Sequence, residues 1–376
     1  MKILFASHSA ALAGAEQSLL HLVREATERG HTGTVVLPEP GPLADRLREV
    51  SESFNVLILP NRLWIGRRFN VVVGAVRLMQ AISDVPRYLA HLRSGNYAAV
   101  VVNSSVSPVP LIAARLAKVP VLQIVRESLL TNPMLKSALP KSIVKRLIHT
   151  YSSSVICISQ YVAAQYSYPC QIVYPQVDRR FFGTNSKRPP IQDLPPFRAV
   201  ICGTLSPEKG QADAVRAISI ARSLGTDVEL DIYGDGRAQD IHQLESLIDH
   251  LKVRDFVKLR GSTSDMLSVY QGADVAVVCS RNEGFGKVTA EAVLTGRPVI
   301  AYGLGGTSEI LEYGGGILTA PSPNDMGAAL HRVFAQPGLL ARLQDEAHAS
   351  PIRTRLSRSA QLVIDSVEEL RPRQTH

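Results

Sequence analysis

The strongest constraint on the fold is a regular alternation of short apolar, β-branched runs with longer amphipathic segments. In the first half the expected strands are residues 3–6, 34–37, 56–59, 98–102, 121–125, 155–158 and 171–174. A second series follows at residues 199–202, 228–233, 257–259, 275–278, 298–301 and 316–319. This rhythm is typical of parallel sheets connected by crossover helices. The chain is therefore expected to be an α/β protein with two such sheets.

A polar, proline-rich segment separates the two series. Residues 183–197 contain four prolines and little to bury, as in a linker. With 376 residues, the chain is also too long for one hydrophobic core. We therefore predict an N-terminal Rossmann-like domain over residues 1–182, the linker over 183–197, a C-terminal Rossmann-like domain over 198–355 and a closing amphipathic helix over 356–376.

Positive charge is concentrated in the first half of the chain. Residues 1–180 hold 20 Lys and Arg against 10 Asp and Glu, whereas the remaining residues hold 21 against 23. Such asymmetry indicates an anionic partner, either a phosphate-bearing acceptor, a membrane surface or nucleic acid, with a merely solvated surface as the alternative. Nucleic acid is disfavoured because few aromatic residues interleave the basic ones and no recognised motif accompanies them.

The four cysteines and the N-terminus indicate a cytoplasmic protein. None of the cysteines has C-x-x-C spacing, so we expect reduced core residues. The N-terminus reads as a strand followed by a glycine turn rather than as a signal peptide. The uncharged stretch 98–114 contains Asn, Ser and Pro, so any membrane contact is expected to be peripheral.

The strongest chemical signal is the segment 283–291, which follows the expected strand 275–278. Gly284 and Gly286 allow close approach of a ligand to the backbone. A helix from about Lys287 would point its free N–H groups at a phosphate. Glu283 in the loop and Glu291 in the helix would address different hydroxyls of one ligand. The alternative is a capped surface helix with two solvated acids.

Three further glycine turns follow expected strands, at residues 13–16, 203–210 and 303–309. In the second of them Lys209 can neutralise a phosphate. Each turn is a weak signal alone, but together they favour a ligand in a cleft between the two domains.

These motifs resemble glycosyltransferase family 4, a retaining group with the GT-B architecture of two Rossmann-like domains whose parallel sheets face across a cleft. The resemblance covers essentially the whole chain. The matching residues are Ser7-His8-Ser9, Gly14-Ala15-Glu16, Gly41-Pro42-Leu43, Ile158-Ser159, Val177-Asp178 with Phe181, Lys209-Gly210, Glu283 with Glu291, Gly296 to Ile300, and Gly305-Gly306 with Glu309.

The resemblance implies that residues 1–182 bind the acceptor and that residues 198–355 bind the nucleotide sugar. It also implies roles for individual residues of a donor site. Lys209 and Glu283 are the expected catalytic residues, facing the diphosphate and the sugar hydroxyls respectively. Glu291 would hold the ribose. The other expected donor-binding residues are Gly14, Gly203, Thr204, Phe285, Gly286 and Lys287.

Three departures from the family pattern affect the phosphate and acceptor sides. Thr204 stands where many members have Arg, and Ala13-Gly14 replaces a double glycine. Arg126 and Glu127 follow a strand that ends in His in many relatives. Both are acceptor-side candidates, with a surface ion pair as the alternative, and His8 is a third candidate that a structural role would explain equally well.

The expected function is that of a hexosyltransferase-like enzyme. It would move a sugar, with retention, from a UDP- or GDP-sugar to a hydroxyl of a glycan or lipid-linked acceptor in cell-envelope polysaccharide or glycolipid synthesis. No cofactor or metal is expected, since the sequence has no Asp-x-Asp pair and no His/Cys cluster. The alternatives are a GT-B nucleotide-sugar epimerase and a non-catalytic, membrane-associated sugar-binding subunit.

The basic and apolar residues of two segments, Arg62 to Arg93 and Met134 to His149, predict peripheral contact of the first domain with an anionic membrane. The alternative is that the apolar residues belong to the core and the charges are solvated. The protein is then expected at the inner face of the plasma membrane.

Overall fold

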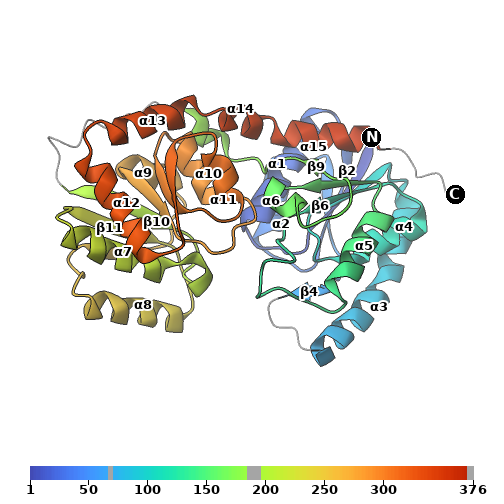
Figure 1. The fold of residues 1–376 in the computed structure, drawn as a ribbon. Helices are drawn as coiled ribbons and strands as arrows, with labels where there is room; N and C mark the ends of the chain where they lie inside the picture. Colours follow the sequence, from blue (N-terminus) through green and yellow to red (C-terminus); the bar gives the residue numbers. More distant parts are fainter. Residues whose placement is uncertain (67–70, 184–195, 371–376) are drawn as a thin grey trace. The chain divides into compact units, whose positions relative to one another are not determined.

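The computed structural model describes residues 1–66, 71–183 and 196–370 (Figure 1). The chain forms two compact units. The first unit contains Met1–Gln176 together with the segment that begins at Arg358, and the second contains Val177–Ser357. Arg67, Arg68 and most of the predicted linker lie outside the described residues.

The first unit is built on a seven-stranded sheet in which every pair of neighbours is parallel, in the order β3-β2-β1-β5-β6-β8-β9. Its strands are β1 (Lys2–Ala6), β2 (Thr32–Leu37), β3 (Phe54–Ile58), β5 (Ala99–Val102), β6 (Val121–Val125), β8 (Ser154–Cys157) and β9 (Gln171–Ile172). The four residues of β5 are all buried, as expected for a central strand covered on both faces.

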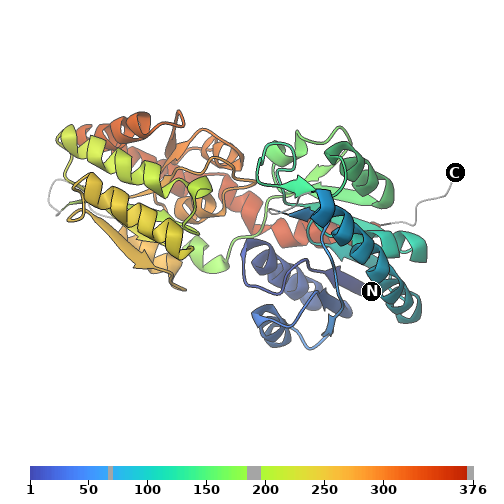
Figure 2. The same cartoon turned by 90° about the horizontal axis from the view of Figure 1, so that it is seen from below.

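The helices of the first unit are α1 (Gly14–Glu28), α2 (Pro42–Val50), α3 (Val71–Gly95), α4 (Pro108–Ala117), α5 (Lys141–Tyr151), α6 (Gln160–Ala163) and α15 (Ser359–Glu368). Helix α3 packs along α4 (Figures 1 and 2). A short antiparallel pair, β4 (Ile65–Gly66) with β7 (Lys136–Ser137), was not anticipated from the sequence.

The closing helix α15 packs against α1 of the first unit. Arg29 at the end of α1 donates hydrogen bonds to Asp365 at 2.6 Å and to Glu368 at 3.1 Å. His31 lies 2.7 Å from the same Glu368 carboxylate. The last helix thus returns to the unit in which the chain begins.

The second unit carries a six-stranded parallel sheet in the order β12-β11-β10-β13-β14-β15. Its strands are β10 (Phe197–Cys202), β11 (Val228–Tyr233), β12 (Val257–Gly261), β13 (Val275–Val278), β14 (Val299–Tyr302) and β15 (Gly316–Thr319). The strand order reverses between β10 and β13, and in open parallel sheets ligands bind beyond the carboxyl ends of the strands at such a point.

The helices of the second unit are α7 (Gln211–Ser223), α8 (Ala238–His250), α9 (Met266–Gly272), α10 (Lys287–Leu294), α11 (Gly306–Leu311), α12 (Pro323–Ala335), α13 (Leu339–Ala349) and α14 (Ile352–Ser357). The described residues of this unit also include the 3-10 helices η1 (Arg179–Gly183) and η3 (Pro207–Lys209). Helices α7 and α8 lie side by side (Figure 2). The predicted class, α/β with two Rossmann-like parallel sheets, is confirmed.

The units divide at different residues from the predicted domains. The first unit ends at Gln176 rather than at residue 182. The reason is that η1 packs into the second unit, where the rings of Phe181 and Tyr270 lie 6.1 Å apart. The second unit also keeps α14, whose Arg353 donates to the carbonyls of Phe182 and Leu294. The predicted cleft between the sheets stays a prediction.

Candidate functional site

Three loops of the second unit meet at the carboxyl ends of β10, β13 and β14. The turn at Lys209–Gly210 lies directly against the end of β13. Gly210 has a φ of +72°, and a Cβ there would come within 2.3 Å of the Cys279 carbonyl oxygen. Only glycine fits this position, so the sequence pair Lys209-Gly210 fixes the lysine beside the β13 loop.

Lys209 and Glu283 form an ion pair between the loops that follow β10 and β13. The Lys209 Nζ donates a hydrogen bond to the Glu283 Oε2 at 2.6 Å, and the side chains are 33% and 20% exposed. The Glu283 backbone is held by the β14 loop, since the Gly306 N–H donates to its carbonyl at 2.8 Å. Two sequence-predicted residues are thus brought together at a solvent-accessible edge of the sheet.

Glu291 occupies a more enclosed position in α10. It is 8% exposed, and the Tyr270 hydroxyl donates to its Oε2 at 3.2 Å. The ammonium of Lys287, one turn earlier, lies 3.7 Å from Oε1. Burial raises the pKa of Glu291, and the positive charge of Lys287 partly offsets this effect. An enclosed carboxylate of this kind suits hydroxyl recognition.

The start of α10 lies against the β14 loop. Gly286, the residue before the helix, has a φ of +95°, and a Cβ there would meet the Thr307 hydroxyl at 2.8 Å. Phe285 is 4% exposed, so its ring belongs to the core. The segment therefore offers a ligand its backbone and its glutamates rather than an aromatic ring.

Sequence reasoning missed a glutamine that shapes the lysine loop. Gln211 is buried at the start of α7 and donates to the Thr204 carbonyl at 3.1 Å, while its Oε1 accepts from the Ser206 N–H at 3.3 Å. Gly203 has a φ of +136° at the first residue of this loop, and Thr204 is exposed. A single glutamine belongs to no sequence motif, so nothing in the sequence points to it. Tyr270 on α9, which donates to Glu291, was also missed because no motif contains it.

A groove of about 360 Å³ lies beside this loop. It is bounded by the loop and by helices α7 and α8, and Leu205, Pro207 and Leu244 are among its lining residues.

The acceptor-side candidates of the first unit gather at the ends of β1, β5 and β6. Arg126 donates to the Asn103 backbone carbonyl at 2.8 Å and to its Oδ1 at 2.7 Å. Burial lowers the pKa of Arg126 to about 10, against the opposing attraction of Glu127 and Glu16, so the guanidinium stays charged at neutral pH. The charges of Arg126, Glu127 and Glu16 therefore act on one another.

Glu127 is held by the turn after β5. Its carboxylate accepts from the Ser105 N–H at 3.1 Å and from the hydroxyls of Ser104 and Ser105. Arg126 and Glu127 thus each bind the loop after β5 instead of forming an exposed ion pair on the surface. His8 follows β1, and Gly14 opens α1.

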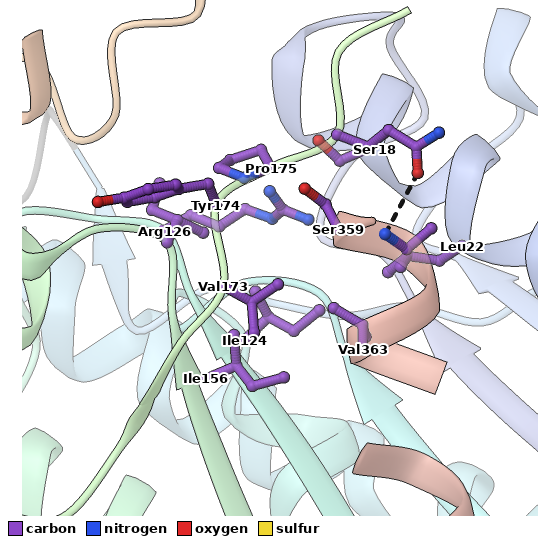
Figure 3. A pocket seen from close by; sticks show the side chains of 13 residues that line it. Ser18, Leu22, Ile124, Arg126, Ile156, Val173, Tyr174, Pro175, Ser359 and Val363 are labelled. Carbon is purple, nitrogen blue, oxygen red and sulfur yellow. Dashed lines mark hydrogen bonds between the residues drawn. The ribbon is translucent and has the colours of Figure 1, made fainter. Parts of the chain in front are cut away.

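A small cavity lies where α15 covers this edge of the first sheet. Arg126 and Tyr174 line it, with Ile124, Ile156 and Val173 facing Val363 of α15 (Figure 3). Its volume of about 20 Å³ holds roughly one water molecule. The cavity is therefore a small gap in the packing between the closing helix and the sheet, and it is too small to hold a sugar or a nucleotide.

The fold defines a class of protein, the α/β proteins built on two Rossmann-like parallel sheets. Two family profiles match the chain. Glycosyl transferases group 1 matches residues 196–336, and the glycosyl transferase 4-like domain matches residues 13–168. The chain therefore belongs to the family 4-like glycosyltransferases of the GT-B fold.

Curated relatives carry glycosyltransferase names. The D-inositol 3-phosphate glycosyltransferase of Streptomyces bingchenggensis is 37% identical over 114 residues, covering 29% of this chain and 25% of that protein. The lipopolysaccharide core biosynthesis glycosyltransferase LpsD of Rhizobium meliloti is 30% identical over 166 residues, covering 44% and 46%. The matched segments thus span less than half the length of these two relatives.

Solved structures match over nearly the whole chain. HepE from Anabaena in complex with UDP-glucose gives a TM-score of 0.78 at 21% identity, covering 98% of this chain and 100% of that one. WaaG, a glycosyltransferase involved in lipopolysaccharide biosynthesis, gives 0.69 at 15% identity, covering 98% and 100%. At these identities the likeness shows a shared fold.

The described residues contain neither a candidate membrane span nor a candidate metal-ion cluster. No helix within them has the length and apolar character needed to cross a membrane. Nor does the described part of the chain bring together three or more His, Cys, Asp or Glu in a way that would hold a metal ion.

Proposed function

We propose that the protein transfers a sugar, with retention of anomeric configuration, from a UDP- or GDP-sugar to a hydroxyl of a glycan or lipid-linked acceptor. The carrying observation is the Lys209–Glu283 pair at the point where the strand order of the second sheet reverses. Family membership, and solved structures of the same fold that contain UDP or UDP-glucose, support a nucleotide-sugar donor.

In this proposal the second unit binds the donor. Lys209 faces the diphosphate, where negative charge grows as the glycosidic bond breaks, so its effect is larger in the transition state than in the ground state. Glu283 accepts hydrogen bonds from sugar hydroxyls, and the enclosed Glu291 accepts them from the ribose. Lys209 and the N–H groups at the start of α10 supply the positive potential, without a metal ion.

The first unit binds the acceptor, and Gly14 presents backbone N–H groups to the donor phosphate. Arg126 supports the loop after β5 through Asn103, and that loop in turn holds Glu127. The serine and glutamate groups there offer hydrogen bonds to an acceptor hydroxyl. Relatives named for lipopolysaccharide core synthesis support an envelope polysaccharide or glycolipid as product.

We also propose that the first unit docks on an anionic membrane at the inner face of the plasma membrane. Helix α3 carries a stripe of exposed apolar side chains, Val72, Val76, Met79 and Ile82. The first unit also exposes basic residues, among them Arg77 on the same helix and Arg146 on α5. Apolar insertion combined with cationic attraction is the pattern of an interfacial helix.

One experiment tests the proposed function against its alternatives. The protein is incubated with UDP- and GDP-sugars, with and without a lipid extract, and nucleoside diphosphate release is measured. Release that requires acceptor supports the transferase. Isomerised donor without any acceptor would indicate the epimerase, and donor binding without release the non-catalytic subunit. Lys209→Ala serves as the inactive control.

A further inference from the structure

Two shielded polar atoms face each other in the first unit without completing a hydrogen bond. The His8 Nδ1 and the Glu16 Oε1 lie 3.6 Å apart. Both atoms are hidden from solvent, and within the described ranges neither has a hydrogen-bond partner. Glu16 as a residue is only 1% exposed, whereas the His8 side chain is 22% exposed. The pair is thus buried on its Glu16 side and accessible on its His8 side.

Local structure explains why a carboxylate is tolerated here. Glu16 lies in the first turn of α1, where the free N–H groups of the helix favour negative charge. The guanidinium of Arg126 also attracts it. A buried carboxylate oxygen without a hydrogen bond nevertheless lowers the stability of the fold, because its hydration is lost without replacement. Packing alone gives no reason to keep this group.

The chemistry of imidazole gives such a reason. When Nδ1 carries its proton toward a carboxylate, the Nε2 is left as a hydrogen-bond acceptor, and the carboxylate fixes the ring orientation. Hydrogen bonds of functional sites are often long in ligand-free structures and shorten when substrate binds. A separation of 3.6 Å between shielded atoms fits this behaviour.

We propose that Glu16 is a positioning residue that holds the Nδ1–H tautomer of His8, so that the His8 Nε2 accepts a hydrogen bond from the acceptor hydroxyl. The inference rests on the proposed transferase function and adds a residue to it. His8 contacts the acceptor, and Glu16 acts only through His8.

A double-mutant cycle tests this coupling. His8→Ala, Glu16→Gln and the double variant are compared for kcat/KM toward acceptor and for Kd of the nucleoside diphosphate. We expect Glu16→Gln to lower kcat/KM by about ten-fold, equivalent to about 1.4 kcal/mol, with the diphosphate Kd unchanged. The double variant should be no worse than His8→Ala. Glu25→Gln, another carboxylate on α1, is the matched control and should behave as wild type.

Additive losses in the double variant would overturn the proposal, because they would mean that Glu16 does not act through His8. A second measurement needs neither activity nor a variant that folds. Nitrogen-15 chemical shifts of the imidazole in the ligand-free wild type report its tautomer directly. Protonated Nδ1 supports the proposal, and a dominant Nε2–H form refutes it. A wild-type protein that releases no nucleotide with any acceptor refutes the proposed function instead, and the tautomer then decides the pairing by itself.

Discussion

The Lys209 Nζ donates a hydrogen bond to the Glu283 Oε2 at 2.6 Å, although 74 positions separate the two residues in the chain. The contact forms because β10 and β13 are neighbours in the sheet and their loops leave it at the same edge. In the structure the expected phosphate-binding cation is therefore paired with the expected sugar-binding carboxylate. A donor has to replace this contact with its own groups.

Removal of either partner should nearly abolish transfer. For Lys209→Ala and Glu283→Ala we expect turnover to fall by about 10²–10³-fold, the usual loss when a group that stabilises developing charge is deleted. Thermal unfolding should change little, because both side chains are partly exposed. Near-normal turnover in either folded variant would remove these residues from the site.

The ion pair also predicts an opposite effect on product binding. In Glu283→Gln the ammonium of Lys209 loses its competing carboxylate, so a nucleoside diphosphate should bind more tightly, by up to about five-fold for a partly exposed pair. Lys209→Gln should weaken the same binding. Calorimetric titration of both variants with UDP and GDP measures these changes. Weaker binding to Glu283→Gln would show that the two side chains do not compete with the phosphate.

Glu291 should control donor affinity rather than turnover. Loss of charge-assisted hydrogen bonds to a ribose in Glu291→Gln should weaken donor binding by about ten-fold or more, with kcat much less affected. Burial raises the pKa of Glu291, so donor affinity in the wild type should fall on acidification earlier than an ordinary glutamate would allow. The glutamine variant should lack this acidic loss.

The same raised pKa makes a prediction about stability. A glutamate whose pKa is higher in the folded than in the unfolded state stabilises the fold at low pH and loses that contribution as the pH rises through the folded value. At neutral pH Glu291→Gln should therefore unfold at a temperature equal to or above that of the wild type. Tyr270→Phe is the control for the loss of a single hydrogen bond to Glu291, because it removes the hydroxyl but keeps the ring packed against Phe181. This variant should weaken donor binding only slightly. A destabilised Glu291→Gln would contradict this assignment.

Local sequence signals predicted the strands of the two sheets and the glycine turns that follow several of them. Apolar β-branched runs marked every strand of the two parallel sheets, most clearly central ones such as β5, which is buried on both faces. The glycine turns marked the loops because close contacts such as that of Gly210 with Cys279 allow no side chain. The residue pattern of a buried strand and a glycine at a turn can both be recognised within a few residues of sequence.

Contacts between residues that lie far apart in the chain could not be predicted from local sequence patterns. The two-residue strands β4 and β7 are too short to show a period, and their pairing depends on where α3 and α5 pack. The closing helix was predicted from its spacing, but its attachment to the first unit depends on Arg29 and Asp365, which only the fold brings together. Glu16 was noted as part of a glycine-turn motif, whereas its approach to His8 and Arg126 arises from the adjacency of β1, β5 and β6.

The stereochemistry and metal independence of the reaction are also open to direct test. The new glycosidic bond should keep the donor's anomeric configuration, as in the family that the chain resembles, and a chelator should not stop transfer because Lys209 supplies the positive charge at the diphosphate. Product NMR reads the configuration. Inversion would contradict the retaining mechanism, and loss of activity in EDTA that returns with a divalent cation would contradict metal independence.

Membrane docking through α3 makes the final prediction. The exposed fractions of Val72, Val76, Met79 and Ile82 are 71%, 42%, 63% and 58%, and their spacing places them along one side of the helix. An apolar stripe of this kind on a unit with exposed basic residues should bind vesicles containing phosphatidylglycerol and should be released by added salt, because each basic residue near the surface contributes about 1 kcal/mol through screened attraction. Sedimentation of the full chain with such vesicles, against pure phosphatidylcholine, measures this.

Two sets of variants separate the apolar from the ionic contribution. Met79→Ser with Ile82→Ser should reduce vesicle binding at every salt concentration, whereas Arg77→Gln with Arg146→Gln should reduce mainly the salt-sensitive part. The matched control is Leu224→Ser with Leu318→Ser, which removes two exposed apolar side chains from the second unit. Those variants should sediment as the wild type does. Equal recovery of the wild type in the supernatant with and without anionic vesicles would exclude the membrane and leave a freely diffusing acceptor as the partner of the basic first unit.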